Sequence, residues 1–299
     1  MCYNHAMYEL IQAAGGTYYV QCPAKIGIVR TGGDEVCLID SGSSRDAARK
    51  VRQILEGKGW VLRAIFNTHS NADHIGGNRY LQERTGCAIY APGIERDLTA
   101  HPLLEPSFLW GGYPCAELRH KFLMAEPSDA RELTDGALPD GMTAVALPGH
   151  FFSMTGFRTA DDVVFLADCL AGKATLEKYG ITFVYDVAAY LDTLEKVKAM
   201  EARLFVPSHA EATEDIAPLA QLNIDRTHEI AERILALCRM PRSFESVLQG
   251  LFSGYGLSMT FDQYALAGST VRSYLSWLKD AGLLSAAFED NALLWERLG

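Results

Sequence analysis

The sequence lacks the long apolar runs that mark membrane-spanning proteins. No stretch of its 299 residues approaches the roughly 20 consecutive apolar residues that a membrane helix needs. The N-terminal stretch MCYNHAMYEL has neither the basic region nor the apolar segment of a signal peptide. We therefore expect a cytoplasmic protein that does not associate with a membrane.

Paired cysteines are also missing. The chain has seven cysteines, an odd number, and they are scattered without any C-x-x-C pair. This spacing argues against both a disulfide framework and a zinc site made of thiolates. We expect reduced, mostly buried cysteines that pack as small apolar residues: Cys2, Cys22, Cys37, Cys87, Cys115, Cys169 and Cys238.

Basic residues are scarce as well. The chain carries 27 Lys and Arg against 37 Asp and Glu, which gives a formal net charge of −10. Affinity for nucleic acid rests largely on neutralising phosphates with Lys and Arg. The charge therefore makes a nucleic-acid partner unlikely and favours a small-molecule substrate.

Short apolar strands and helices alternate over the first two thirds of the chain. Strands are expected at 8–12, 17–22, 25–31, 35–40, 60–67 and 87–91, with helices at 45–59 and 78–86. Later strands are expected at 142–150, 154–160, 162–168 and 203–209, with a helix at 187–201. Such an alternation predicts a layered α/β fold. Residues 100–140 contain several prolines, and we expect loops and short elements there, with a possible strand at 118–125.

From about residue 223 the pattern becomes helical. Three helices are expected at 225–238, 243–252 and 264–282, followed by a hairpin that turns at 289–291. We therefore divide the chain into a domain at 1–222 and a small, mainly helical domain at 223–299.

Ligand-type side chains crowd the loop after the strand at 60–67. The stretch HSNADH, residues 69–74, holds two histidines and an aspartate. Alternating loop residues can point to one side, so positions 69, 71, 73 and 74 can converge. Imidazole and carboxylate groups suit divalent transition metals, and strand ends are where α/β folds build their sites. Three further candidates end apolar runs: His150, Asp168 and His209. We expect the remaining histidines to lie outside this metal site: His5, His101, His120 and His228.

These motifs, in this order, resemble the metallo-β-lactamase superfamily, whose signature is H-x-H-x-D-H followed by a histidine, a bridging aspartate and a last histidine. The matching stretches are HSNADH at 69–74, LPGH at 147–150, LADCL at 166–170 and VPSH at 206–209. The resemblance covers about residues 8 to 215. It implies a four-layer αβ/βα sandwich with a metal site at one edge.

The resemblance also implies a role for each matched residue. His69, Asn71 and His150 would form a first metal site, and Asp73, His74 and His209 a second, with Asp168 bridging the two ions. A metal-activated water would be the nucleophile. Asp73 would be catalytic, orienting this water and later helping to protonate the leaving group.

Asn71 departs from the family pattern, which has histidine at this position. A carboxamide oxygen is a weaker ligand for zinc than imidazole is. We expect Zn²⁺ as one or two ions, in this order: two metals with a depleted first site, one metal in the second site, or a site that has lost catalysis. A change to iron or manganese is open, and Asn71 could instead hydrogen-bond a ligand or water.

Superfamily members act on many substrates, so the fold does not choose one. We expect a hydrolase acting on a small ester, thioester or lactone. Residues 169–186 follow the bridging aspartate, and we take Lys173, Tyr179 and Tyr185 as candidate substrate contacts. A second candidate wall is 100–120, with Phe108, Trp110 and Tyr113.

Two alternatives stay open. A phosphodiesterase or nuclease would need a basic cleft, which the sequence does not show. A binding module would have kept the fold with a metal site impaired at Asn71. The C-terminal region resembles a winged-helix-like domain, but it is acidic overall, so a role as a lid, in packing or in forming a homodimer is favoured over nucleic-acid binding.

Overall fold

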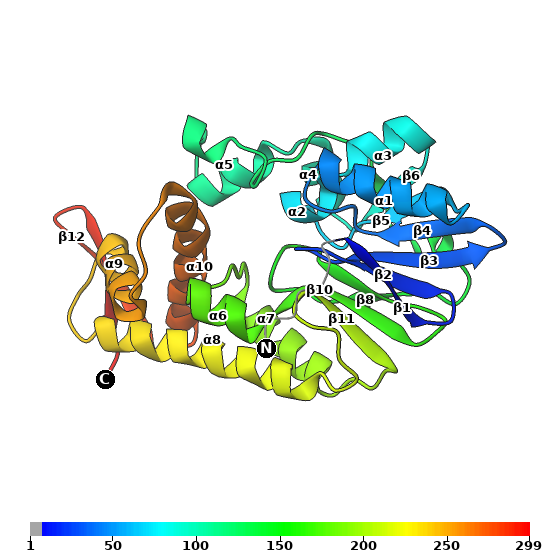
Figure 1. Ribbon diagram of the computed structural model, residues 1–299. Coiled ribbons are helices and arrows are strands. Elements are labelled where there is room, and N and C mark those ends of the chain that lie inside the picture. Colours follow the sequence, from blue (N-terminus) through cyan, green and yellow to red (C-terminus); the bar gives the residue numbers. More distant parts are fainter. Residues whose placement is uncertain (1–7) are drawn as a thin grey trace.

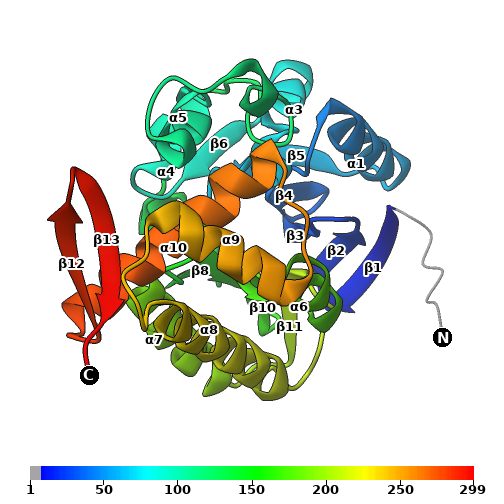
Figure 2. The same cartoon turned by 90° about the vertical axis from the view of Figure 1, so that its left-hand side faces the viewer.

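The computed structural model of the protein describes residues 8–299, so the expectations for Cys2 and His5 lie outside the described residues. Two sheets face each other, and helices cover their outer faces (Figure 1). Viewed from the side, α1 and α3 lie on one outer face, and α7 and α8 lie on the other (Figure 2). This is the predicted αβ/βα sandwich with a mainly helical C-terminal region.

The first sheet has seven strands that follow one another in chain order. They are β1 (Glu9–Ala14), β2 (Thr17–Gln21), β3 (Ile26–Gly32), β4 (Glu35–Ile39), β5 (Val61–Phe66), β6 (Ala88–Ala91) and β7 (Arg131–Glu132). The strands from β1 to β4 pair antiparallel, and those from β4 to β7 pair parallel. Helices α1 (Arg45–Gly57) and α3 (Asn78–Thr85) bury Val51, Leu55 and Leu81 against the outer face of this sheet.

The second sheet has four strands in the order β11-β10-β9-β8. They are β8 (Thr143–Ala146), β9 (Thr155–Arg158), β10 (Val163–Ala171) and β11 (Leu204–His209), with α7 (Val187–Lys198) and α8 (Ala217–Leu237) outside. Apolar residues from both sheets form the core between them, which fixes how the two sheets sit: Ile39, Phe66, Phe157, Phe165 and Val206.

The predicted strand at 118–125 is wrong. This segment contains the short 3-10 helix Ala116–Leu118 and then turns. Its apolar residues Leu118 and Leu123 are buried against Leu109 and Ala265 instead of in a sheet. Two further helices, α4 (Glu95–Ala100) and α5 (Leu104–Trp110), and the short 3-10 helix Asp135–Ala137 complete this region.

The C-terminal region continues the second half of the sandwich. It consists of α9 (Phe244–Tyr255), α10 (Phe261–Asp280), β12 (Leu284–Glu289) and β13 (Ala292–Arg297). The predicted boundary at 222/223 falls inside α8, and one hydrophobic cluster runs from β10 through α7 and α8 to α9 and α10. The division into two domains and the winged-helix resemblance remain predictions.

Candidate metal centre

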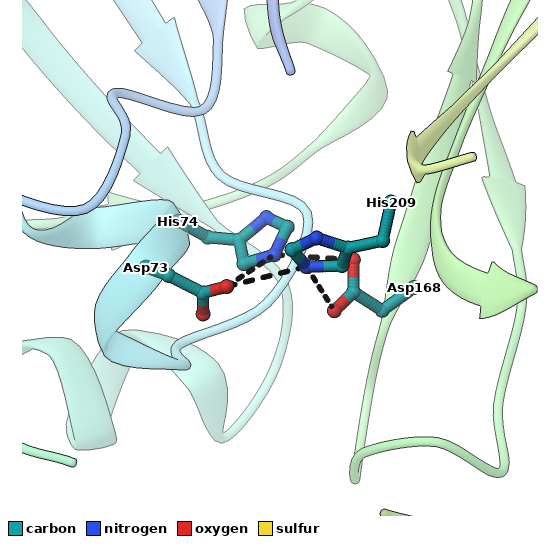
Figure 3. Close-up of side chains that lie close together, drawn as sticks. All are labelled: Asp73, His74, Asp168 and His209. Carbon is teal, nitrogen blue, oxygen red and sulfur yellow. Dashed lines mark ion pairs between the residues drawn. The ribbon is translucent and has the colours of Figure 1, made fainter. Parts of the chain in front are cut away.

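Four separate segments bring ligand-type side chains to one edge of the sandwich. His69 lies in the loop after β5, and the short helix α2 (Ala72–Ile75) carries Asp73 and His74. Figure 3 shows these two residues facing Asp168 and His209, which come from β10 and β11 of the other sheet. The site therefore forms only when the two halves of the sandwich meet.

One group consists of Asp73, His74, Asp168 and His209, whose nearest nitrogen and oxygen atoms all lie within 4.8 Å of one another. Nε2 of His74 lies 3.1 Å from Oδ1 of Asp168, and Nε2 of His209 lies 3.1 Å from Oδ2 of Asp168. Nε2 of His209 is also 3.2 Å from Oδ2 of Asp73. These four side chains could hold one metal ion.

The other group corresponds to the predicted first metal site. It consists of His69, His150 and Asp168, within the same 4.8 Å limit. Asp168 thus belongs to both groups, as a bridging ligand would. Nε2 of His150 lies 3.9 Å from Oδ2 of Asp168. The structure therefore brings together all six predicted histidines and aspartates.

Each of the four histidines is anchored through Nδ1 and turns Nε2 toward the centre. The partners of Nδ1 are Thr68 Oγ1 at 2.9 Å for His69, Asp40 Oδ2 at 2.8 Å for His74, the Phe183 carbonyl at 3.0 Å for His150 and the Pro23 carbonyl at 2.8 Å for His209. Such partners select the ring tautomer and leave the other nitrogen for a metal.

Asp40 directly follows β4 and holds two of these rings, His74 directly and His69 through Thr68. Its carboxylate accepts hydrogen bonds from the Thr68 amide and hydroxyl, each at 2.8 Å, as well as from His74. The Thr68 hydroxyl donates its proton to Asp40, so the Thr68 oxygen accepts a hydrogen bond from Nδ1 of His69. Asp40 has a φ of +63°, which aspartate tolerates better than most residues.

Asp168 lies inside β10, because the strand runs on to Ala171 rather than ending at 168 as expected. The pairing of β10 with β11 shifts register on both sides of Ala167, which has a φ of +50°. An irregularity of this kind re-aims the next side chain. Here it directs the Asp168 carboxylate between the two groups.

The donor set fits a divalent metal ion. Buried polar atoms nearly always have a hydrogen-bond partner. Within residues 8–299, however, Nε2 of His69 is buried without one, and Nε2 of His74 and Oδ1 of Asp168 make no hydrogen bond although they lie 3.1 Å apart. All three atoms face the centre of the site, and a cation bound there would satisfy them. Nitrogen and oxygen donors of this type suit zinc, and also iron or manganese.

Buried charge pairs dominate the electrostatics of the site. Burial opposes a charge on His209, but Asp168 and Asp73 outweigh it and raise its pKa to about 10. Burial likewise opposes ionisation of Asp73, yet His74 and His209 lower its pKa to about 2. A metal ion competes with the proton on an imidazolium such as that of His209, because a histidine nitrogen must be deprotonated before it can bind a metal.

Asn71 lies beside His150 of the predicted first metal site. It is the N-cap residue of α2, but its side chain makes no capping hydrogen bond. Its Oδ1 lies 3.2 Å from Nε2 of His150, and its Nδ2 donates to Glu105 Oε1 at 2.7 Å. Nothing in the sequence signals Glu105, which arrives from α5 in a segment expected to be irregular.

Glu95 is a second buried carboxylate that the sequence did not reveal. Its Oε2 accepts from the Ser70 hydroxyl at 2.6 Å and the Ser70 amide at 3.1 Å, and its Oε1 accepts from the Ser153 amide at 2.8 Å. It thereby ties the loop after His69 to the loop after His150. Burial raises the pKa of Glu95 to about 7, against these hydrogen bonds.

A cavity of about 740 Å³ opens above the metal ligands. Its walls are largely apolar. Thr260, the N-cap residue of α10, and Gln263 and Leu266 of α10 also line it. Lys178, on α6 (Lys173–Tyr179), is the single Lys or Arg among the residues that line it. Phe122 and Leu123 form part of the wall.

The three candidate substrate contacts are placed differently. Tyr179 lines this cavity, whereas Tyr185 lines a second cavity of about 810 Å³ together with Phe108 and Trp110. Lys173 lines neither cavity, and its Nζ lies 3.9 Å from Glu177.

Features expected to lie outside the metal site do so among the described residues. The six described cysteines are free, and all except Cys115 are buried. His120 bonds Asp262 on α10 at 2.9 Å instead of joining the ligands. None of the helices within residues 8–299 has the length and apolar character to cross a membrane.

Comparison with known proteins agrees with this geometry. A family model described as the metallo-beta-lactamase superfamily matches residues 20–209. A β-lactamase domain protein from Burkholderia ambifaria has a similar structure, with a TM-score of 0.75 and 18% identity over 98% of this chain and 94% of that one. A metallo-β-lactamase family protein from Thermus thermophilus has a TM-score of 0.73 and 18% identity over 95% of this chain and 99% of that one.

Sequence similarity to curated proteins is confined to a short stretch. A hydroxyacylglutathione hydrolase from Thiobacillus denitrificans is 50% identical over 42 residues, which is 14% of this chain and 16% of that protein. The extended match of the family model, together with the ligand geometry, decides the assignment. The chain belongs to the metallo-β-lactamase superfamily.

Proposed function

We propose that the protein is a metal-dependent hydrolase of small thioesters, with esters and lactones as related substrates. One observation carries this proposal: two ligand groups share Asp168 at the base of a largely apolar cavity of about 740 Å³. The short match to a hydroxyacylglutathione hydrolase favours a thioester, although it covers only 16% of that protein.

The side chains have distinct roles in this reaction. The two ligand groups would hold a divalent metal, which would supply the Lewis acidity that activates a water molecule and polarises the scissile carbonyl. Asp73 is 39% exposed in its side chain and therefore faces the cavity. With a pKa of about 2, it stays ionised at neutral pH and orients the attacking water as a hydrogen-bond acceptor.

The cavity favours a substrate with an apolar acyl group and an acidic leaving group. Leu170, Ile181 and Phe183 lie along the wall next to the ligands and suit the acyl part. Lys178 donates to the Tyr179 hydroxyl at 3.0 Å near the rim, where the pair can bind a carboxylate of the departing thiol. A nucleic acid would require a basic surface, which this cavity with its single lysine does not offer.

We further propose that zinc is the metal and that the two groups bind it unequally. The group with Asp73 offers four charged or imidazole ligands, whereas the group with His69 adds only the neutral amide of Asn71 to three. The first site should therefore bind zinc more weakly. Replacing Asn71 by histidine is expected to raise occupancy of this site.

The test is hydrolysis by the purified, zinc-loaded protein. S-lactoylglutathione, a short acyl thioester, a lactone and bis(p-nitrophenyl) phosphate are offered in parallel. Thioester turnover is expected, with loss on chelation and a fall on the order of 10²-fold or more for Asp73→Asn. Asp192→Asn, an exposed position on α7, is the matched control and should behave as wild type.

Two results would overturn the proposal. Preferential cleavage of the phosphodiester would support the phosphodiesterase alternative. Zinc binding without turnover of any of the four compounds would support a binding module.

A further inference from the structure

We propose, on the basis of the metal-dependent function above, that Glu105 is a positioning residue for the first metal site. It holds the side-chain amide of Asn71 so that the carbonyl oxygen, and not the NH₂ group, faces Nε2 of His150. Asn71 thereby becomes the oriented oxygen ligand that stands in for the histidine of the family pattern.

The contact is buried and comes from a remote segment. Glu105 lies 34 positions after Asn71, on α5, and its side chain is only 5% exposed. Its Oε1 accepts from Nδ2 of Asn71 at 2.7 Å. The other end of the same amide, Oδ1, lies 3.2 Å from Nε2 of His150.

When ionised, Glu105 selects the orientation of the amide, because a carboxylate only accepts hydrogen bonds. Burial raises the pKa of Glu105 well above its ordinary value, whereas the hydrogen bond from Asn71 and a cation in the adjacent site favour the ionised form. Turning the Asn71 amide by half a rotation would place its oxygen against the Glu105 carboxylate, two acceptors with no proton between them. The NH₂ group would then point at the imidazoles and exclude a cation. Glu105 therefore favours the one orientation that offers a lone pair to the site.

The way in which α2 begins supports this reading independently. An asparagine at an N-cap usually bonds the amide of its own first turn. Asn71 occupies that position but makes no such bond. Nε2 of His69, the other histidine of this site, is buried without a hydrogen-bond partner. Asn71 therefore makes no capping hydrogen bond, and its side-chain oxygen lies next to the predicted metal site instead.

The test measures binding of Zn²⁺ itself, by titration against a chromophoric chelator, with metal content checked by elemental analysis. Glu105→Gln lets the amide sit either way round, because glutamine can donate as well as accept. We expect it to weaken the first site about tenfold or more, as loss of an outer partner of a metal ligand typically does. The second site should keep its affinity, which also shows that the variant is folded. Glu117→Gln, exposed in the same region, is the matched control.

A double-variant cycle shows whether Glu105 acts through Asn71. Asn71→Ala should weaken the first site, and adding Glu105→Gln to it should change nothing further. Asn71→Asp should bind zinc poorly on its own, because two carboxylates then face each other. In the Asn71→Asp, Glu105→Gln pair the aspartate is free to bind, and the first site should become tighter than in wild type.

The inference is overturned if Glu105→Gln leaves first-site affinity unchanged, or if it weakens zinc binding equally with and without Asn71. It is also overturned if Asn71→Asp alone binds zinc more tightly than the double variant. These outcomes do not depend on turnover. Absence of hydrolysis with the expected order of affinities would refute only the proposed function.

Discussion

The four imidazole rings of the site share one arrangement, in which Nδ1 is held by a protein oxygen and Nε2 is left at the centre. The ligands themselves are visible in the sequence, because HSNADH and the three residues that end apolar runs, His150, Asp168 and His209, have ligand chemistry and spacing. The residues that hold these ligands in place are not visible in the sequence. Glu95 and Glu105 reach the site from α4 and α5 through contacts that no local pattern encodes.

Asp40 gives the first prediction at the residue scale. Asp40→Asn should lower zinc affinity by about 10- to 100-fold, because the amide cannot accept from both Thr68 and His74 as the carboxylate does. Asparagine tolerates the positive φ at this position, so the backbone is kept. Zinc competition assays measure the effect. Asp34→Asn, on the exposed β3–β4 turn, is the control, and equal affinities for the two variants would count against the anchoring role.

Lys178 and Lys173 allow a matched comparison on one helix. Lys178→Ala should raise KM about tenfold for a thioester whose thiol carries carboxylates, with kcat nearly unchanged, because the lost contact lies at the rim and away from the reacting carbonyl. Lys173→Ala should have no effect, since Lys173 lies outside the lining. Steady-state kinetics with acidic and neutral thiol leaving groups decide the matter. Equal KM changes in the two variants would rule out a specific role for Lys178.

At the scale of elements, sequence periodicity predicts regular strands and helices well and the connecting region poorly. The strands from β1 to β6 and the helices α1 and α3 appear near their expected positions, because each has an apolar face of the right period. The segment at 118–125 does not form a strand. Its two buried leucines pack on α5 and α10, which are distant in sequence, so its local pattern carries no information on the partner.

Glu95 links two elements of the site and gives a prediction on pH. Its folded pKa of about 7 lies above the ordinary value of 4.5, so its protonated form stabilises the fold at low pH. That contribution is lost as pH rises through about 7. The free energy of unfolding of wild type minus that of Glu95→Gln should therefore fall by up to about 3 kcal/mol between pH 4.5 and 8.

Urea unfolding of the metal-free proteins at several pH values measures this difference. Titration of the metal ligands is common to both proteins and cancels in the subtraction. Glu83→Gln, which changes an exposed carboxylate on α3, should show no such dependence. Parallel stability profiles for wild type and Glu95→Gln would show that Glu95 does not titrate in this range.

At the scale of the whole molecule, the C-terminal helices share the core of the second sheet. Leu166 and Phe205 belong to the same hydrophobic cluster as Leu248 and Leu275. Composition and helical periodicity indicate where the helices lie, but they do not show that the helices pack into an existing core. The proposed boundary at 222/223 therefore separates residues whose side chains are buried together.

A fragment of residues 1–222 tests this shared core. It would cut α8 and remove Ile224, Ile230 and Ile234 from the cluster. We expect the fragment to melt without a cooperative thermal transition and to bind a hydrophobic dye. The full chain should melt cooperatively and should not bind the dye. A fragment that melts cooperatively near the temperature of the full chain would instead support 1–222 as an independent domain.

The N-terminal part of α10 lines the cavity, although the metal ligands all lie earlier in the chain, between residues 69 and 209. Amide hydrogens there should consequently exchange with solvent more slowly when an inhibitor fills the cavity, while those at the solvent-facing end of β12 keep their rate. The C-terminal part of the chain would thus report occupancy of a reaction centre to which it contributes no ligand.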